Sequence, residues 1–154
     1  NISTLRVLSK FWMPLKKELV IIGGDLVGLE LAEFLTERGK KITVVEPSND
    51  LGPNLSIVRR SRVIHLLISH GVKIIKNAKD IKISNSDVNF ERDGTSQSVI
   101  ANQVIIAMGT ESNTEFAKEL RENNFNVSMV GDCTSGGYIE GAISDARIAV
   151  KEIV

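Results

Sequence analysis

The chain has 154 residues, 42% hydrophobic and 25% charged, which is typical of one folded domain and excludes a disordered or fibrous protein. Its 19 basic and 19 acidic residues balance, so neither nucleic acid nor an anionic membrane surface is expected as a partner. A single cysteine, Cys133, excludes an internal disulfide framework and favours a reducing, cytoplasmic location.

The ends of the chain suggest a piece of a longer protein. The sequence begins without Met, and its last periodic stretch stops without a terminating Gly or Pro. No apolar run approaches the ~20 residues that a membrane-spanning helix needs. We therefore expect a fragment that does not insert into a membrane.

The first half of the chain alternates predicted strands and helices. A lead-in, residues 1–17, contains a predicted short helix at 4–10 and the helix-disfavouring Pro14. Apolar periodicity then predicts strands at 18–22, 41–46 and 71–75, and helices at 25–39 and 56–70. This β-α-β-α-β order is half of a doubly wound sheet.

The second half begins with short alternating stretches. Residues 81–84, 87–90 and 98–101 predict an antiparallel three-stranded β-meander. A buried strand follows at 103–109, then a helix at 115–122, a strand at 127–130 and a closing helix from about Gly137. The predicted fold class is α/β, a Rossmann-like doubly wound parallel sheet with a β-meander insert.

A glycine-rich turn lies between the first strand and the first long helix. Its residues are Gly23, Gly24, Asp25, Leu26, Val27 and Gly28. Exposed backbone amides and the helix dipole favour the pyrophosphate of a dinucleotide at such a turn. However, Asp25 replaces the middle glycine of the G-x-G-x-x-G pattern. Its carboxylate would repel a pyrophosphate, or alternatively serve only as an N-cap that stabilises the helix by ~1 kcal/mol.

Glu46 ends the second strand about 18 residues after Gly28, close to the ~20 expected for an acid that binds a ribose diol. This spacing favours NAD or FAD. An NADP 2′-phosphate would be repelled by Glu46 and would need a nearby Arg, whereas Pro47, Ser48 and Asn49 follow. The alternative is a solvated glutamate at a strand end.

Three ordered motifs extend the pattern along the chain. They are VIIGGDLVGLELA at 20–32, VIIAMGTESN at 104–113 and VGDC at 130–133. From about residue 18 onward the sequence resembles the pyridine-nucleotide-disulfide-type flavoprotein oxidoreductases. The likeness is greatest to NADH:flavin oxidoreductases such as 2,4-dienoyl-CoA reductase and enoate reductase.

The resemblance implies an NAD(H)-binding domain at residues 18–125 and part of an FAD-binding domain at residues 126–154. It places Gly131 and Asp132 at the flavin's ribityl and phosphate region, Gly109 where the two domains meet, and Glu30 on the nicotinamide side. Each has an alternative: Asp132 could cap the last helix, Gly109 could be a plain turn glycine, and Glu30 could be a surface residue.

The sequence shows no catalytic set. Alone, Cys133 cannot run dithiol chemistry and is expected to be a partly buried structural thiol. His65 and His70 lack a second ligand at metal-binding spacing, so no metal site is predicted. The resemblance implies that the chain lacks a first FAD fingerprint, an FMN barrel and an iron–sulfur cysteine cluster, so no turnover is expected from the chain alone.

Three functional hypotheses follow. In the first, the chain positions NADH for hydride transfer to FAD within a parent flavoenzyme, with the remaining domains of that enzyme as its partners. In the second, it is a degenerate structural or interaction domain, in which Asp25 has closed the dinucleotide site. In the third, it binds FAD alone, because a ribose-binding acid serves either dinucleotide.

Overall fold

The computed structural model describes residues 2–134 and 137–153. Contacts between backbone positions divide the chain into two units, Asn1–Gly109 and Thr110–Val154. The first contains all the strands found among the described residues, and the second contains two helices. The two units are therefore described separately.

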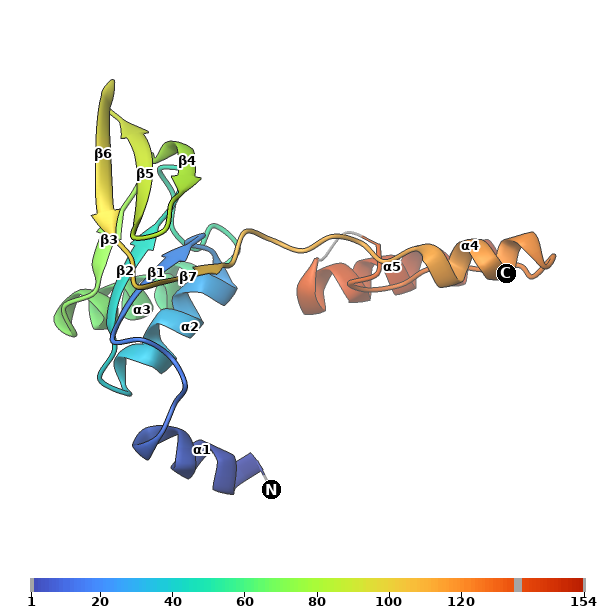
Figure 1. The fold of residues 1–154 in the computed structure, drawn as a ribbon. Coiled ribbons are helices and arrows are strands. Elements are labelled where there is room, and N and C mark those ends of the chain that lie inside the picture. The colour runs from blue at the N-terminus through green and yellow to red at the C-terminus, as the bar shows by residue number, and fades with distance from the viewer. Residues whose placement is uncertain (1, 135–136, 154) are drawn as a thin grey trace. The chain divides into compact units, whose positions relative to one another are not determined.

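A four-stranded parallel sheet forms the centre of the first unit (Figure 1). Its order is β3-β2-β1-β7, where β1 is Glu18–Ile22, β2 is Lys41–Val45, β3 is Lys73–Ile75 and β7 is Gln103–Ile106. In this register Ile22 pairs with both Val45 and Ile106. The carboxyl ends of β1, β2 and β7 therefore meet at one edge of the sheet.

Two helices cover one face of this sheet, α2 (Leu26–Thr36) and α3 (Ile57–Ser69). Side chains alternate along a strand, so Leu19 and Ile21 of β1 face these helices. They pack with Leu29 and Leu35 of α2 and Leu67 of α3, all of which are buried. This apolar layer fixes the amino end of α2 beside the carboxyl end of β1.

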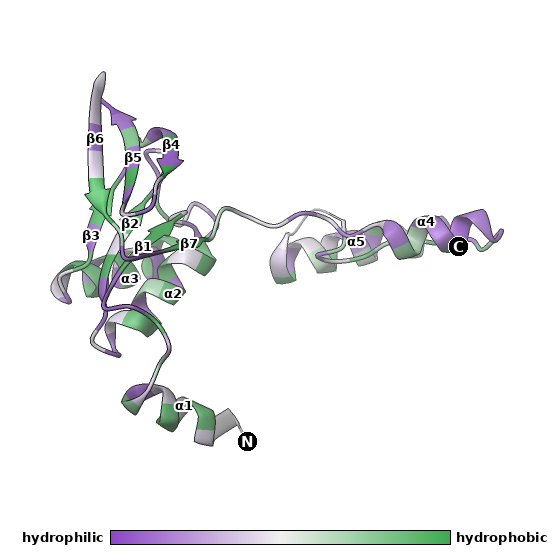
Figure 2. Ribbon diagram, in the orientation of Figure 1, coloured by the Kyte–Doolittle hydropathy of each residue, from purple (hydrophilic) through white to green (hydrophobic). Residues whose placement is uncertain are grey.

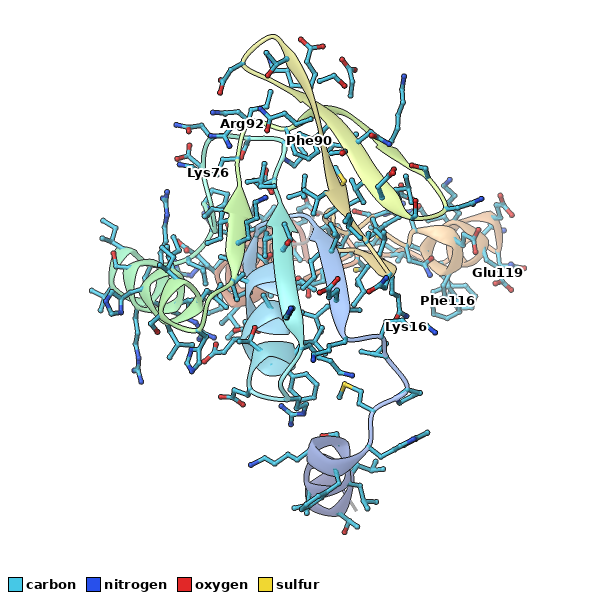
Figure 3. The ribbon with its side chains drawn as sticks, turned by 60° about the vertical axis from the view of Figure 1, so that its left-hand side comes forward. Lys16, Lys76, Phe90, Arg92, Phe116 and Glu119 are labelled. Carbon is cyan, nitrogen blue, oxygen red and sulfur yellow. The ribbon has the colours of Figure 1, made fainter. Side chains whose placement is uncertain are left out.

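The opposite face is covered by the antiparallel meander, formed by β4 (Lys79–Ile83), β5 (Asp87–Arg92) and β6 (Thr95–Ile100). Val20 and Ile22 of β1 pack there with Val88 and Phe90 of β5. Of these residues, Figure 3 labels Phe90. Figure 2 shows hydrophobic residues at the end of β6 nearest the parallel sheet. The predicted α/β fold with its β-meander insert is confirmed, and the meander replaces helices on this second face.

The lead-in helix α1 extends over Ile2–Phe11, slightly longer than the predicted 4–10. Arg38 connects it to the end of α2: its Nε donates a hydrogen bond to Ser9 Oγ at 3.0 Å. The Arg38 guanidinium also lies 3.5 Å from the centre of the Phe34 ring. Much of the apolar face of α1 remains exposed, including Phe11 at 85%.

The second unit contains α4 (Glu115–Glu122) and α5 (Tyr138–Ile153). Ala117 is the only core residue among its described part. Phe116, which projects from α4 in Figure 3, is 69% exposed. The predicted strand at 127–130 is wrong, because the structure assigns no strand there. A strand needs a neighbour for its backbone hydrogen bonds, and the described part of this unit contains no other strand.

Candidate functional site

The glycine turn joins β1 to α2 at the carboxyl edge of the sheet. Gly23 has φ +112°, and a Cβ built there would lie 2.2 Å from the carbonyl oxygen of Ala107. A Cβ on Gly28 would lie 1.9 Å from the carbonyl oxygen of Gly23, and one on Gly24 would lie 2.5 Å from Leu51 Cδ2. The backbone therefore leaves no room for a Cβ at Gly23 and Gly28, as the close approach of helix to strand requires, whereas a Cβ at Gly24 would displace the Leu51 side chain.

Glu46 lies directly beside this turn. Its Oε2 accepts a hydrogen bond from the Gly24 N–H at 2.6 Å, and its Oε1 accepts one from the Ser48 N–H at 2.8 Å. The side chain is partly buried at the end of β2. Each carboxylate oxygen retains acceptor capacity beyond one hydrogen bond. The carboxylate is thus fixed in position and can still accept hydrogen bonds from a diol.

Asp25 precedes the first residue of α2. It has the extended backbone of an N-cap residue but makes no side-chain hydrogen bond to the helix, so the alternative in which its carboxylate caps α2 is not what the structure shows. Instead, Asp25 Oδ2 accepts a hydrogen bond from Asn54 Nδ2 at 2.9 Å. Asp25 Oδ1 is buried without a hydrogen-bond partner. Asn54 had no recognisable signal in the sequence.

The first turns of α2 carry the remaining residues predicted in this region. Leu26 is half-buried, whereas Val27, the second residue of α2, is 55% exposed. Glu30 is exposed and forms an ion pair with Arg59 of α3. An exposed ion pair contributes little to stability, so Glu30 remains available for other contacts.

Gly109 is the last residue of the first unit. It follows the end of β7, where the Ala107 N–H donates a hydrogen bond to the Ile22 carbonyl at 2.7 Å. The φ of Gly109 is +76°, a left-handed conformation that favours glycine. Gly109 therefore provides the left-handed backbone conformation that the chain adopts at the boundary between the two units.

In the second unit, Gly131 and Asp132 lie in a loop before α5. Gly131 has φ +88°, and its N–H donates a hydrogen bond to Asp145 Oδ2 at 3.2 Å. Thr134 Oγ1 donates to the same oxygen at 2.6 Å. Asp132 itself is exposed and lies before α5, which begins at Tyr138. Asp145 rather than Asp132 therefore ties this loop to α5.

We expect Asp145→Ala to loosen the loop at 131–134. Loss of the two hydrogen bonds to a charged oxygen should speed amide hydrogen exchange at Gly131 roughly tenfold, as a net loss of ~1.5 kcal/mol would. Ser144→Ala, an exposed neighbour on α5, is the control and should leave the exchange rate unchanged. Equal exchange rates in wild type and Asp145→Ala would show that the loop is held by other contacts.

Two expectations concern thiol and metal chemistry. The prediction that Cys133 is partly buried is wrong: Cys133 is exposed, as are Val130 and Asp132 of the same loop. Among residues 2–134 and 137–153, no group of three or more His, Cys, Asp or Glu side chains could hold a metal ion. No helix in the described part of the chain is long and apolar enough to cross a membrane.

The fold of this chain is found in solved structures of other proteins. A 2-naphthoyl-CoA reductase complex superposes with a TM-score of 0.78 at 24% identity, over 86% of this chain and 20% of that protein. Histamine dehydrogenase from Rhizobium sp. 4-9 superposes with a TM-score of 0.76 at 18% identity, over 95% of this chain and 25% of that protein.

Curated proteins are also similar to this chain in sequence. An NADH oxidase from Thermoanaerobacter brockii is 28% identical over 130 residues, which are 83% of this chain and 20% of the relative. A bilirubin reductase from Mediterraneibacter gnavus is 30% identical over 134 residues, which are 86% of this chain and 21% of the relative. The chain thus spans about a fifth of the length of these two relatives.

A family model described as pyridine nucleotide-disulphide oxidoreductase matches residues 2–152. The match includes the glycine turn, Glu46 and the loop that contains Gly131 and Asp132. The chain therefore belongs to the pyridine nucleotide-disulphide oxidoreductase family.

Proposed function

We propose that this chain is the NADH-binding portion of a larger flavin-dependent oxidoreductase, in which it positions NADH for hydride transfer to FAD. The NAD(H)-binding part would be residues 18–125, and residues 126–154 would belong to the FAD-binding part. The cofactors supply the hydride chemistry, and the protein binds and orients them. The chain alone is not expected to catalyse the reaction.

The observation that carries this proposal is the position of the Glu46 carboxylate, 2.6 Å from the Gly24 N–H of the glycine turn. A pyrophosphate bound at the amino end of α2 would bring the adjoining ribose toward this carboxylate. The carboxylate would accept hydrogen bonds from the 2′- and 3′-hydroxyls of NADH. It would repel the 2′-phosphate of NADPH.

The supporting residues have distinct roles in the proposal. Gly23, Gly24 and Gly28 shape the pyrophosphate turn, and the backbone of residues 25–27 begins the helix on which the phosphates rest. Glu30 is proposed to face the nicotinamide. Gly109, Gly131 and Asp132 are proposed to serve the flavin side, which the remaining domains of the parent enzyme would complete.

A second candidate is a degenerate structural or interaction domain that has lost its dinucleotide. The observation in its favour is Asp25 itself, whose carboxylate occupies the place of the middle glycine and has one buried, unpaired oxygen. A carboxylate beside a pyrophosphate would weaken binding by like-charge repulsion. On this hypothesis Asp25→Gly would restore NADH binding to a chain that otherwise lacks it.

Parallel calorimetric titrations of the chain with NADH, NADPH and FAD test these proposals. We expect saturable binding of NADH and at least tenfold weaker binding of NADPH, because like charges placed together cost several kcal/mol. Binding of FAD alone, with a yellow preparation, would instead support a flavin domain. Binding of none of the three by wild type, with NADH binding by Asp25→Gly, would support the degenerate domain.

A further inference from the structure

Asp25 occupies the N-cap position of α2 without capping the helix. Its φ of −87° and ψ of −171° are extended, as in ordinary N-cap residues, but no helix amide donates to its carboxylate. An aspartate there normally accepts from the N–H of the second or third helical residue, here Val27 or Gly28. A contact outside the helix must therefore direct the carboxylate elsewhere.

Asn54 supplies that contact. Its Nδ2 donates to Asp25 Oδ2 at 2.9 Å from the loop between β2 and α3. The loop is itself anchored, because the Gly52 N–H donates to the Gly24 carbonyl at 2.8 Å and Leu51 is only 6% exposed. Asp25 Oδ1 remains buried and unpaired, although the helix amides would be better partners. The position of the carboxylate is thus imposed by the loop.

We propose that Asn54 is a positioning residue for cofactor binding, which holds the Asp25 carboxylate off the amino end of α2. The inference rests on the proposed dinucleotide site. A capping carboxylate would occupy the amides that a pyrophosphate needs and would repel the phosphate charge. Held by Asn54, it leaves these amides free. The asparagine adds no charge of its own and thereby compensates for the missing middle glycine.

A double-mutant cycle tests this role by calorimetric titration with NADH. Asn54→Ala should weaken NADH binding about fivefold, the factor that corresponds to a typical N-cap interaction competing with the ligand. In the Asp25→Gly background, Asn54→Ala should change the affinity less than twofold, because no carboxylate remains to be held. Asn85→Ala, which removes an exposed asparagine from the turn between β4 and β5, should leave binding unchanged.

Equal weakening by Asn54→Ala in both backgrounds would overturn the proposal, since it would mean that Asn54 acts only by stabilising the loop. Thermal unfolding gives a further distinction. A purely structural role predicts a lower melting temperature for Asn54→Ala. The proposed role predicts little change, because the released Asp25 gains a capping hydrogen bond in place of the one it loses.

Nuclear magnetic resonance separates this inference from the proposed function. Without any ligand, the backbone amide protons of Val27 or Gly28 should shift downfield in Asn54→Ala as the carboxylate begins to cap α2. The shift should be absent in the Asp25→Gly/Asn54→Ala variant. Failure of wild type to bind NADH would defeat the proposed function, whereas unshifted amides in Asn54→Ala would defeat the positioning role of Asn54 whether or not NADH binds.

Discussion

Glu46→Ala is expected to weaken NADH binding roughly 10- to 100-fold, because hydrogen bonds to a charged group contribute about 1.5–3 kcal/mol. The variant removes the proposed acceptor for the ribose hydroxyls. It also releases the Gly24 and Ser48 amides that the carboxylate holds in place. Titration calorimetry of the variant and wild type with NADH measures the change. Wild-type affinity in Glu46→Ala would mean that Glu46 does not hold the ribose.

Two further variants test whether the charge of Glu46 or its hydrogen bonds determine the preference for NADH. Glu46→Gln keeps one oxygen that can accept from the Gly24 N–H but loses the charge, so NADPH should bind relatively better than in wild type. Glu18→Ala is the matched control, because Glu18 lies at the amino end of β1 and pairs only at the surface with Lys41. It should leave both affinities unchanged.

Gly28→Ala is expected to lower the free energy of unfolding of the first unit by roughly 2–4 kcal/mol. The new Cβ would lie 1.9 Å from the carbonyl oxygen of Gly23, so the backbone of α2 or of the turn must move. The melting temperature should fall by on the order of 10 °C. Thermal unfolding followed by circular dichroism measures the effect.

Gly141→Ala is the matched control for this substitution, since Gly141 is also a helical glycine. A Cβ at Gly141 meets nothing within 4 Å. Alanine should increase the helicity of α5, because it favours helix over glycine by about 1 kcal/mol. Equal losses of stability in the two variants would show that helix propensity, rather than the close approach at the glycine turn, decides the outcome.

Most of the first unit could be predicted because its signals are local. A run such as residues 19–22, apolar at every position, is buried on both sides, and the structure confirms that Leu19 and Val20 face different layers. The turn between β5 and β6 follows from Asp93 and Gly94, both of which have positive φ. Periodicity and turn chemistry together therefore identified the elements and their order.

The prediction was wrong where structure depends on a neighbour. Residues 127–130 have the apolar character of a strand, but a strand forms only beside a partner, and the described part of the second unit offers none. The expected partial burial of Cys133 was also wrong, since the structure places this residue at the surface. Sequence reports the preference of a segment, whereas pairing and burial depend on what surrounds it.

The candidate site was predictable only in part. Gly23, Gly28 and Glu46 were found because fixed spacing along the chain places them at one corner of a strand–helix–strand unit. Asn54 and Asp145 were missed because their contacts are long-range hydrogen bonds: Asn54 donates to Asp25, and Asp145 accepts from Gly131 and Thr134. No spacing rule relates such pairs. The sequence around a single polar residue does not indicate which distant group that residue will bind.

Both hydrogen-bonding groups of Gly24 are engaged, the N–H by Glu46 and the carbonyl by the Gly52 N–H. If the proposed NADH site is correct, a change of its nucleotide preference therefore requires the exchange of a whole loop rather than of one side chain. An arginine at position 46 would add a favourable charge for a 2′-phosphate, but it would leave the Gly24 amide without its acceptor. A change of preference from NADH to NADPH would require replacement of residues 46–54 together, so that both hydrogen bonds of Gly24 to this loop are kept.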